Sequence, residues 1–350
     1  MGNPQGNPRV LIVTPEVNYL PKGMGNMANS LTAKAGGLAD VSAALISSLF
    51  EQGADVHVAL PDYRAIFGPN FDPFVTKESD AIRRTMPEER IHLAEDRAFY
   101  YLDHIYSNYG CENTKIALKF QREVINNIIP QVQPDIIHCN DWVTGLIPAE
   151  ARRLNIPCLF MVHNIYTTKC PMSYIDDRGI DAASFWQHLF FEYVPGNYEQ
   201  ARESDPVDFL VSGIFASHFV NSVSPTFLNE VAEGRHSFVE EPIRQELSKK
   251  KEAPGCASGI LNAPDPSFDP LSDDALAFQY SAEDHVKGKK INKRLLQETL
   301  GLIQDERAPL FFWSSRLDTT QKGCQLPAEI FYDGVRDSDV PVSEFSTVTA

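Results

Sequence analysis

The stretch that decides the fold is residues 31–53, LTAKAGGLADVSAALISSLFEQG. It follows the apolar run VLIV at 10–13, whose composition predicts a buried strand. From Leu38 to Leu49 apolar residues recur at helical spacing, and Gly53 stands where a glycine commonly ends a helix. The sequence therefore predicts a strand, then a Gly-Gly turn, then an amphipathic helix.

The paired glycines Gly36 and Gly37 suggest a phosphate site at the start of this helix. They allow backbone N–H groups to approach a ligand at the positive helix end, and Lys34 adds a point charge. Short glycine matches are common, so this pattern alone favours a plain turn with a solvated lysine. The preceding loop, residues 18–33, contains glycine and methionine, and we expect it to be a mobile flap over the site.

Composition places the chain among ordinary globular proteins. Its 350 residues predict about two domains, with 43% hydrophobic and 22% charged residues. The net charge of −16 argues against nucleic acid or an anionic membrane surface as a partner. The basic run 287–294 is a local exception, which we interpret as a solvated helix face.

The cysteines and the N-terminus point to the cytoplasm. None of the six cysteines forms a Cys-x-x-Cys pair, so we expect reduced thiols rather than disulfides or a structural zinc site. The N-terminus has no apolar signal core, and no stretch approaches the roughly 20 apolar residues of a membrane span. We therefore expect a cytoplasmic protein.

The rest of the pattern predicts a parallel α/β sheet. Strands are expected at 55–61, 135–138, 157–162, 218–223 and 259–262, with less regular ones near 71–75 and 97–102. Helices are expected at 115–129, 142–154, 206–216, 224–232 and 283–300. Strands that alternate with helices at this spacing are typical of a parallel sheet. The proline-rich segment 263–270 predicts a boundary between a first domain, residues 1–265, and a second, residues 271–350, whose first strand is expected at 310–315.

His163 and Asn164 directly follow the strand expected at 157–162, at the place where ligands bind in open α/β sheets. Asn140 and Asp141 are expected to cap the helix that begins at Trp142. Taken alone, Asp141 is equally well explained as a helix cap, and His163 is more often a hydrogen-bonded core histidine. We expect His163 and Lys34 to lie at the same carboxyl edge of one sheet.

Five motifs resemble, in the same order, those of bacterial glycogen synthases and plant starch synthases. They are KAGGLADV at 34–41, PDIIHCNDW at 134–142, VHNI at 162–165, VSPT at 223–226 and SRLDTTQKG at 315–323. The resemblance implies a GT-B glycosyltransferase built from two Rossmann-like domains. It implies transfer of glucose from ADP-glucose, less often UDP-glucose, to the non-reducing end of an α-1,4-glucan such as glycogen or a maltooligosaccharide. The transfer would retain configuration and use no metal or other cofactor.

The resemblance also implies roles for individual residues. Arg316 and Lys322 would hold the donor phosphates, although either alone would be read as a surface residue, and His163 would steady the developing oxocarbenium ion through its backbone carbonyl. The expected catalytic set is His163, Asp141, Arg316 and Lys322; the expected phosphate set is Lys34, Gly36, Gly37, Arg316 and Lys322. The expected glucose or acceptor contacts are Asp141, Trp142 (as a stacking platform), Asn164 and Asn262.

Three departures from the family pattern stand out. Asn262 is followed by Ala-Pro-Asp rather than Gly-Ile/Val-Asp, and His163-Asn164 by Ile-Tyr-Thr-Thr rather than a segment with Tyr-Gln-Gly. The sequence ends at Ala350, where the family's second domain continues, so we expect an incomplete second domain and impaired transfer. Another sugar-nucleotide transferase of the sucrose-synthase type and a non-catalytic glucan-binding fragment remain open at this point.

Overall fold

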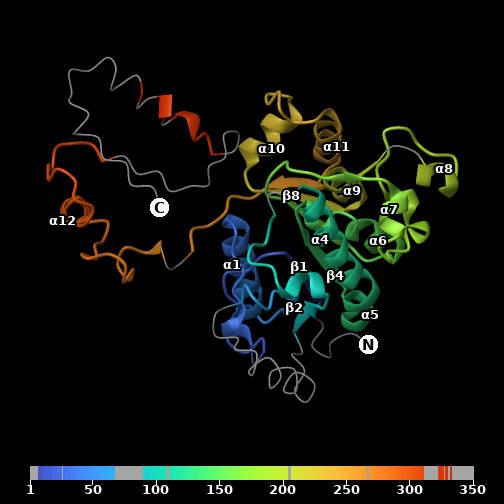
Figure 1. Cartoon of the computed structure of the whole chain (residues 1–350), viewed down its shortest axis with the longest axis horizontal. Coiled ribbons are helices and arrows are strands. Elements are labelled where there is room, and N and C mark those ends of the chain that lie inside the picture. The colour runs from blue at the N-terminus through green and yellow to red at the C-terminus, as the bar shows by residue number, and fades with distance from the viewer. Residues whose placement is uncertain are drawn as a thin grey trace. The chain divides into compact units, whose positions relative to one another are not determined.

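The chain divides into two compact units, Met1–Ala263 and Pro264–Ala350, each with its own elements (Figure 1). The division falls at the start of the proline-rich segment 263–270. The computed structural model describes residues 7–25, 27–67, 90–107, 110–203, 206–265, 268–310, 322–326, 328–329 and 332.

The first unit is built on a seven-stranded sheet. Its strands are β1 (Arg9–Val13), β2 (Asp55–Pro61), β3 (Ile91–Ala94), β4 (Ile136–Asn140), β5 (Cys158–Val162), β8 (Phe219–Ser222) and β9 (Ala257–Gly259). They lie in the order β3-β2-β1-β4-β5-β8-β9, and every neighbouring pair is parallel. The predicted parallel α/β sheet is therefore confirmed.

The strand order reverses beside β1. From β1 the chain proceeds outward to β2 and β3, and then returns to place β4 on the other side of β1. At such a reversal the connections leave on opposite faces, and a crevice opens at the carboxyl ends of the two central strands. β1 ends at Val13, whose register partner is Cys139, and β4 ends one residue later, at Asn140.

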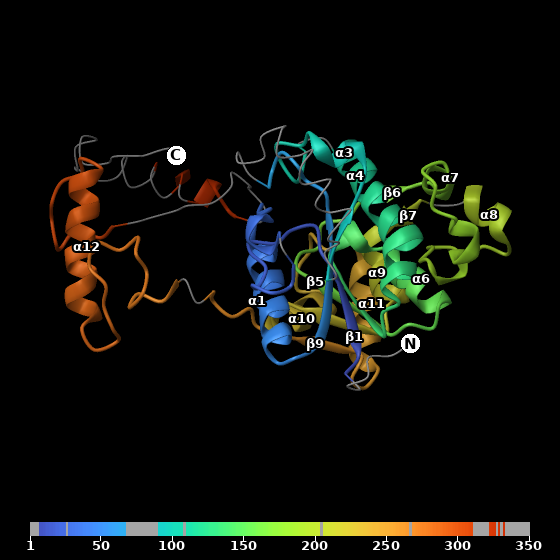
Figure 2. The same ribbon diagram turned by 90° about the horizontal axis from the view of Figure 1, so that it is seen from below.

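Helices cover both faces of the sheet. α1 (Gly37–Glu51) connects β1 to β2, and α6 (Ile147–Arg153) lies between β4 and β5. The two crossovers run in opposite directions along the sheet, and because such connections are right-handed they cover opposite faces. Figure 2 shows α1 on one side of the strands and α4 (Gly110–Glu123), α6 and α9 (Phe209–Ala216) on the other.

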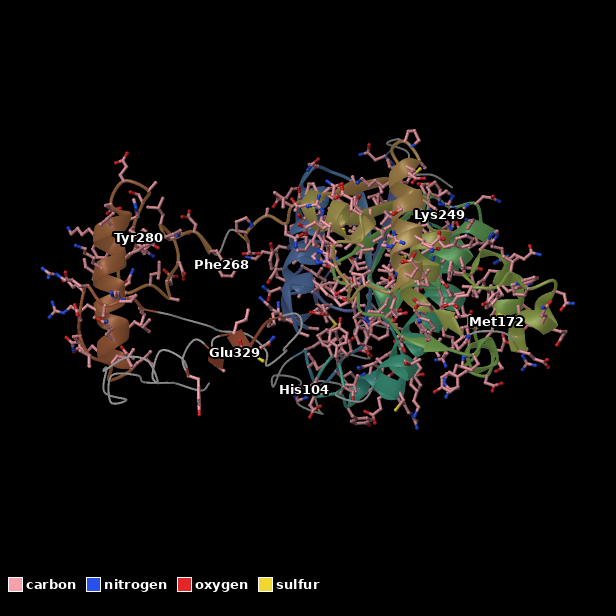
Figure 3. The ribbon with its side chains drawn as sticks, turned by 90° about the horizontal axis from the view of Figure 1, so that it is seen from above. His104, Met172, Lys249, Phe268, Tyr280 and Glu329 are labelled. Atoms are coloured by element: carbon pink, nitrogen blue, oxygen red, sulfur yellow. The ribbon has the colours of Figure 1, made fainter. Side chains whose placement is uncertain are left out.

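The remaining elements of this unit are short or peripheral. They are α3 (Arg97–Tyr100), α5 (Ile129–Val132), β6 (Lys169–Cys170), α7 (Met172–Asp176), α8 (Tyr198–Glu203), β7 (Val207–Asp208), α10 (Pro225–Ala232) and α11 (Glu241–Glu252). α11 was not predicted from the sequence. Figure 3 labels Met172 of α7, which is buried, and Lys249 of α11, which is exposed.

The described residues of the loop 18–33 pack against the core, which argues against the expected mobile flap. Val17 and Ala33 pair across its base, with N···O distances of 2.9 and 2.8 Å. Met24 and Leu31 are buried in the hydrophobic core. The glycine and methionine content suggested mobility, but burial of the apolar side chains against the core fixes this loop.

The segment predicted as a strand at 97–102 is instead the helix α3. The Asp96 side chain caps it by accepting a hydrogen bond from the Ala98 N–H at 2.8 Å. Because that cap satisfies a backbone donor, the local polar pattern outweighs the aromatic residues that suggested a strand. The strand in this region is β3, and the possible strand at 71–75 lies outside the described residues.

The helix predicted to end before Pro130 continues past it. A π-helical turn, Val124–Ile128, follows α4 and leads directly into α5. A π-turn widens the helix locally, which makes room for a proline ring that has no N–H to donate. Gln133 then ends the helix in the left-handed region at φ 51°.

Several predicted elements begin or end elsewhere. The helix expected at 142–154 is a short 3-10 turn, Trp142–Thr144, followed by α6. The helix expected at 206–216 begins only at α9, after the short strand β7. The strand expected at 259–262 is β9, which ends at Gly259.

The second unit contains one long helix, α12 (His285–Thr299), among its described residues. Asn292 fixes the preceding turn, because its amide exchanges two hydrogen bonds with the backbone of Phe278 at 2.8 and 2.9 Å. Lys289 and Lys290 of the basic run are exposed on α12, as predicted for a solvated helix face. The strand expected at 310–315 falls almost wholly outside the described residues.

We predict that Gly145→Ala severely destabilises the first unit. A β-carbon at Gly145 would lie 1.9 Å from the carbonyl oxygen of Phe209. Backbone cannot yield as a flexible side chain does, so we expect a loss of about 3 kcal/mol in the free energy of unfolding, measured by urea denaturation. Gly110→Ala is the control, because its β-carbon would meet its nearest atom, the Tyr166 hydroxyl, at 3.9 Å. Equal midpoints for the two variants would contradict the prediction.

Candidate active site

A buried carboxylate, Glu16, organises the connection between β1 and α1. Its Oε2 accepts hydrogen bonds from the N–H groups of Ala35 at 2.8 Å and Gly36 at 3.0 Å. Its Oε1 accepts from the Tyr106 hydroxyl at 2.7 Å. The protein thus supplies its own anion to the glycine turn, where the sequence predicted a ligand phosphate.

This arrangement corrects the expectation for the glycine pair. The Gly36 N–H is already used by Glu16. Gly37 is the first residue of α1, and a β-carbon placed on it would meet no atom within 4 Å. N–H groups in the first turn of a helix lack partners within the helix. Gly37 is therefore the glycine whose N–H is available to a ligand.

Lys34 is held beside this turn by the first turn of α1. Its Nζ lies 2.8 Å from Oδ1 of Asp40, and the Asn18 amide donates to the same oxygen at 2.9 Å. The Lys34 side chain remains 42% exposed. Its ammonium group is thus positioned by Asp40 and still accessible to a ligand.

Two consecutive residues at the end of β4 tie it to the strands on either side. Asn140 donates from Nδ2 to the carbonyl of Val13 in β1 at 3.0 Å. Asp141 accepts from the N–H of His163 at 2.8 Å and from Nδ2 of Asn164 at 2.9 Å. Asp141 holds φ at 57°, a value uncommon for residues other than glycine. Its side chain makes no cap hydrogen bond, so the helix-cap explanation is wrong.

The hydrogen bonds of Asn140 determine the tautomer of His163. A carbonyl oxygen can only accept, so the Asn140 amide nitrogen must face Val13 and its Oδ1 must face His163. Nε2 of His163 lies 3.0 Å from that oxygen and therefore carries the proton. Burial, with a smaller contribution from the neighbouring His138, lowers the pKa of His163 to about 3. The imidazole is therefore neutral, with its Nδ1 unprotonated.

Asp141 and Glu16 form a pair of interacting buried acids. Burial raises the pKa of Asp141 to about 7, the N–H groups of His163 and Asn164 oppose the increase, and the charge of Glu16 adds to it. The site thus contains one carboxyl group that exchanges its proton near neutrality.

Trp142 does not present an open ring face. Its side chain is 4% exposed, whereas Tyr166 is 50% exposed and packs on it edge to face with 5.3 Å between ring centroids. The Tyr166 N–H donates to Oδ1 of Asn164 at 2.7 Å, which fixes it relative to the turn after β5. The accessible aromatic surface at this edge is therefore Tyr166 rather than the predicted Trp142.

Of the other predicted residues, Asn262 belongs to the same unit as this cluster. Asn262 is exposed beyond the end of β9, and no described hydrogen bond links it to the cluster. Lys322 is an exposed residue of the second unit, and Arg316 lies outside the described residues. His163, Asp141, Asn164, Lys34 and Gly37 all lie at the carboxyl edge of the sheet, as predicted for His163 and Lys34.

The sequence reasoning missed Glu16, Asn140 and Tyr106 as site residues. A signal for Glu16 was present, because it follows the first strand closely, as His163 follows β5. Asn140 was considered only as a cap. Tyr106 had no local signal, since only the fold brings it to Glu16.

Two absences concern only the described part of the chain. There, no group of three His, Cys, Asp or Glu side chains is arranged to hold a metal ion. Nor does that part contain a helix with the length and apolar character needed to cross a membrane.

Comparison with known proteins gives concordant matches. Residues 9–244 match the family model of the starch synthase catalytic domain. A glycogen synthase of Exiguobacterium sibiricum is 30% identical over 325 residues, covering 86% of this chain and 64% of that protein. One of Moorella thermoacetica is 30% identical over 345 residues, covering 92% and 63%. The chain thus spans less than two thirds of the length of these relatives.

A solved structure agrees with the fold. The catalytic domain of starch synthase IV from Arabidopsis thaliana, bound to ADP and acarbose, matches with a TM-score of 0.66 at 22% identity. The match covers 95% of this chain and 67% of that one. At this identity the likeness establishes the shared GT-B fold.

We predict a pH-dependent difference in stability between the wild type and Asp141→Asn. An acid whose native pKa of about 7 exceeds its unfolded value of about 3.9 binds its proton more tightly in the native state. Its contribution to stability is complete below about pH 4 and is lost as the pH rises through about 7. The wild-type advantage in unfolding free energy should therefore shrink between pH 5 and pH 8.

Urea denaturation at pH 5, 6.5 and 8 measures this difference. Titration of His163 and His138 is common to both proteins and largely cancels. Asp177→Asn, at an exposed carboxyl, is the control for the loss of one charge. Parallel stability profiles for the wild type and Asp141→Asn would show that Asp141 does not titrate in this range.

Proposed function

Because this chain belongs to the starch synthase catalytic domain family, we propose that the protein transfers glucose from ADP-glucose to the non-reducing end of an α-1,4-glucan with retention of configuration. One observation carries the proposal. The turn holding His163 and Asn164, the Asp141 carboxyl and the Lys34–Gly37 turn meet at the carboxyl edge beside the strand-order reversal. This is the ligand-binding edge of such sheets.

The donor diphosphate is proposed to lie against the start of α1. In the transfer, the bond between glucose C1 and the phosphate oxygen breaks, and C1 bonds to O4 of the terminal acceptor glucose. The acceptor hydroxyl proton passes to the departing phosphate. Lys34 and the Gly37 N–H would stabilise the charge that grows on that phosphate, and Arg316 and Lys322 are proposed to complete its binding.

The positive charge that develops at C1 is proposed to be stabilised by the backbone carbonyl of His163. Two anchors support this role, because Asp141 holds the His163 N–H and Asn140 holds its imidazole. A residue fixed at both its backbone and its side chain keeps its peptide group in one orientation. Such preorganised dipoles favour a developing charge without a cost of reorientation.

The acceptor glucan is proposed to contact Tyr166. Its ring is half exposed next to the His163–Asn164 turn, and aromatic rings provide apolar faces on which sugars stack. Acarbose, present in the related starch synthase IV structure, is an oligosaccharide-like ligand, which supports an α-glucan as the acceptor class. Asp141, Asn164 and Asn262 are proposed to bind glucose hydroxyls.

Further features of the proposal follow from the family. We propose that transfer needs no metal or other cofactor, and that the protein acts in the cytoplasm, where its six unpaired cysteines would stay reduced. The matches to glycogen and starch synthases give no support to a sucrose-synthase-like reaction. A glucan-binding role without turnover is the alternative that the activity experiment distinguishes.

Incorporation of labelled glucose into glycogen tests the proposed activity. We expect turnover with ADP-glucose to exceed that with UDP-glucose. His163→Ala should lower kcat roughly 100-fold, the size of loss seen when a preorganised stabilising group is removed. His163→Gln can still donate to Asn140 and should retain more activity. Glucan binding with no incorporation by the wild-type protein would instead support the binding alternative.

A pair of Tyr166 variants tests the acceptor contact. Tyr166→Ala should raise the KM for a maltooligosaccharide about 10-fold, because it removes the exposed ring, while the KM for ADP-glucose changes little. Tyr166→Phe keeps the ring and should behave like the wild type. Equal acceptor KM values for Tyr166→Ala and the wild type would place the acceptor elsewhere.

A further inference from the structure

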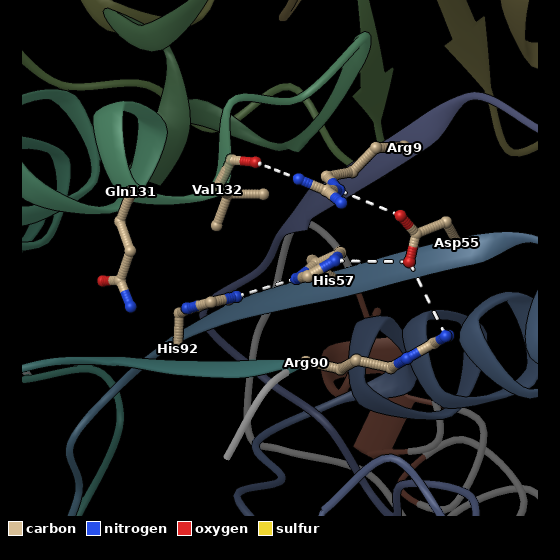
Figure 4. A pocket seen from close by; sticks show the side chains of 7 residues that line it. All are labelled: Arg9, Asp55, His57, Arg90, His92, Gln131 and Val132. Carbon is tan, nitrogen blue, oxygen red and sulfur yellow. Dashed lines mark hydrogen bonds and ion pairs between the residues drawn. The ribbon is translucent and has the colours of Figure 1, made fainter. Parts of the chain in front are cut away.

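A second polar pocket lies at the opposite edge of the same sheet, at the amino ends of β1, β2 and β3 (Figure 4). It is a cavity of about 320 Å³, at the small end of ligand-sized pockets. Its lining residues are Arg9, Asp55, His57, Arg90, His92, Gln131 and Val132. The proposed transfer reaction uses none of them.

The charges of the described lining residues do not balance. Asp55 is the one carboxylate among them, and it lies 2.9 Å from Nε of Arg9, 3.6 Å from Nη2 of Arg90 and 3.4 Å from Nε2 of His57 (Figure 4). Two guanidinium groups against one carboxylate leave one excess positive charge while the imidazoles are neutral. In a chain of net charge −16, this is a local cationic site.

Arg90 keeps donors that the described protein does not use. Arg9 donates hydrogen bonds from Nε to Asp55 and from Nη1 to the Val132 carbonyl, each at 2.9 Å. The Arg90 guanidinium makes only the long ion pair with Asp55 and a contact over the Phe50 ring at 5.5 Å, and no described hydrogen bond. A partly exposed guanidinium with open N–H groups is well suited to bind an oxyanion.

An ion-pair contact of 3.4 Å between Asp55 and His57, followed by a hydrogen bond of 2.9 Å between His57 and His92, connects Asp55 to His92. The carboxylate can only accept, so His57 points its Nε2–H at Asp55 and leaves Nδ1 as an acceptor. Nε2 of His92 lies 2.9 Å from that Nδ1 and therefore donates to it. The remaining nitrogen of His92, Nδ1, is unprotonated, and it can donate to an anion only after it takes up a proton.

We propose that this pocket binds a small tetrahedral oxyanion of the phosphate class through Arg90 and Arg9, and that binding is accompanied by proton uptake at the His57–His92 pair. Burial lowers the pKa of both imidazoles, that of His92 to about 4, and in each case the Arg9 charge contributes. The charge of a bound anion counteracts the Arg9 charge and favours the protonated imidazoles, which raises both pKa values. Affinity should therefore increase as the pH falls toward the range in which the imidazoles take up a proton.

The groups facing the imidazole pair come from every neighbouring element. They are Asp55 on β2, Arg9 on β1, Arg90 before β3, and Gln131 with the Val132 carbonyl on α5. Among the described lining residues, only Asp55 opposes an anion, and it already contacts Arg9, Arg90 and the His57 imidazole. The pocket is also separated by the length of the sheet from the proposed donor-phosphate site, so the two can be distinguished by mutation.

Calorimetric titration with sulfate tests the site, because sulfate remains a dianion from pH 8 to pH 5.5 and contributes no titration of its own. We expect saturable binding that strengthens as the pH falls over this range. Arg90→Gln should weaken it roughly 10-fold, the size of effect of one charged hydrogen bond. Gln131→Glu, at an exposed position, should also weaken it by adding a negative charge at the rim. Arg178→Gln removes a cation elsewhere in the first unit and should leave it unchanged.

His92→Gln separates the proton linkage from binding itself. This variant should bind sulfate like the wild type at pH 8 but should lose the increase at pH 5.5. Inorganic phosphate and glycerol 3-phosphate then distinguish a free ion from a phosphate ester, according to which binds more tightly. No saturable sulfate binding, or binding lost in Lys34→Gln and kept in both Arg90→Gln and Gln131→Glu, would overturn the proposal.

Discussion

The candidate active site depends on the two residues that end β4. The side chain of Asn140 bonds to β1, and the side chain of the next residue, Asp141, bonds to the turn after β5. Two consecutive residues thus hold the strands on both sides of β4. Asp141 needs a positive φ to do this, a conformation that costs energy for a residue with a side chain. Three hydrogen bonds to its carboxylate offset that cost. The reversal of strand order places this pair at the edge where ligands bind in such sheets.

Around that pair, burial disfavours the charged forms of His163 and Asp141. His163 is neutral and fixed in one tautomer, so it offers a defined dipole rather than a cation. Glu16 keeps two backbone N–H groups and a tyrosine hydroxyl as partners, and its charge acts on Asp141. A site built in this way carries negative charge before any donor binds. We infer that cations such as Lys34 are needed beside it because a diphosphate would otherwise meet that charge unscreened.

The two edges of the sheet expose different backbone groups, and their electrostatics differ accordingly. At the carboxyl edge, backbone N–H groups at the start of α1 face outward and favour anions. At the amino edge, the ends of helices expose carbonyl groups instead, and Arg9 donates to one of them, that of Val132. The same arginine also pairs with Asp55. Arg9 and Arg90 thus have structural contacts at this edge, and together they outnumber the described carboxylate, Asp55. The proposed oxyanion pocket depends on the resulting excess of positive charge.

The sequence by itself determined the parallel α/β class, the β1–turn–α1 unit and the carboxyl-edge position of His163 and Lys34. These follow from local signals, namely apolar runs of strand length, helical periodicity and polar residues directly after strands. The five motifs, in their order along the chain, were also sufficient to identify the family. Local signals gave the wrong prediction where one sequence pattern is compatible with two structures. At α3 the Asp96 cap stabilises a helix where a strand was predicted, and before Pro130 a π-turn allows the helix to continue.

Only the tertiary structure decided which groups meet. Glu16 and Tyr106 are 90 residues apart, and Asn140 and Val13 are 127 apart, so no local pattern could pair them. Burial likewise assigned the open aromatic face to Tyr166 rather than Trp142, because exposure depends on neighbours brought in by the fold. The packing of residues 18–33 has the same cause. Hydrogen-bond partners and solvent exposure are properties of the folded chain, and a sequence read along its length specifies only the residues available to form them.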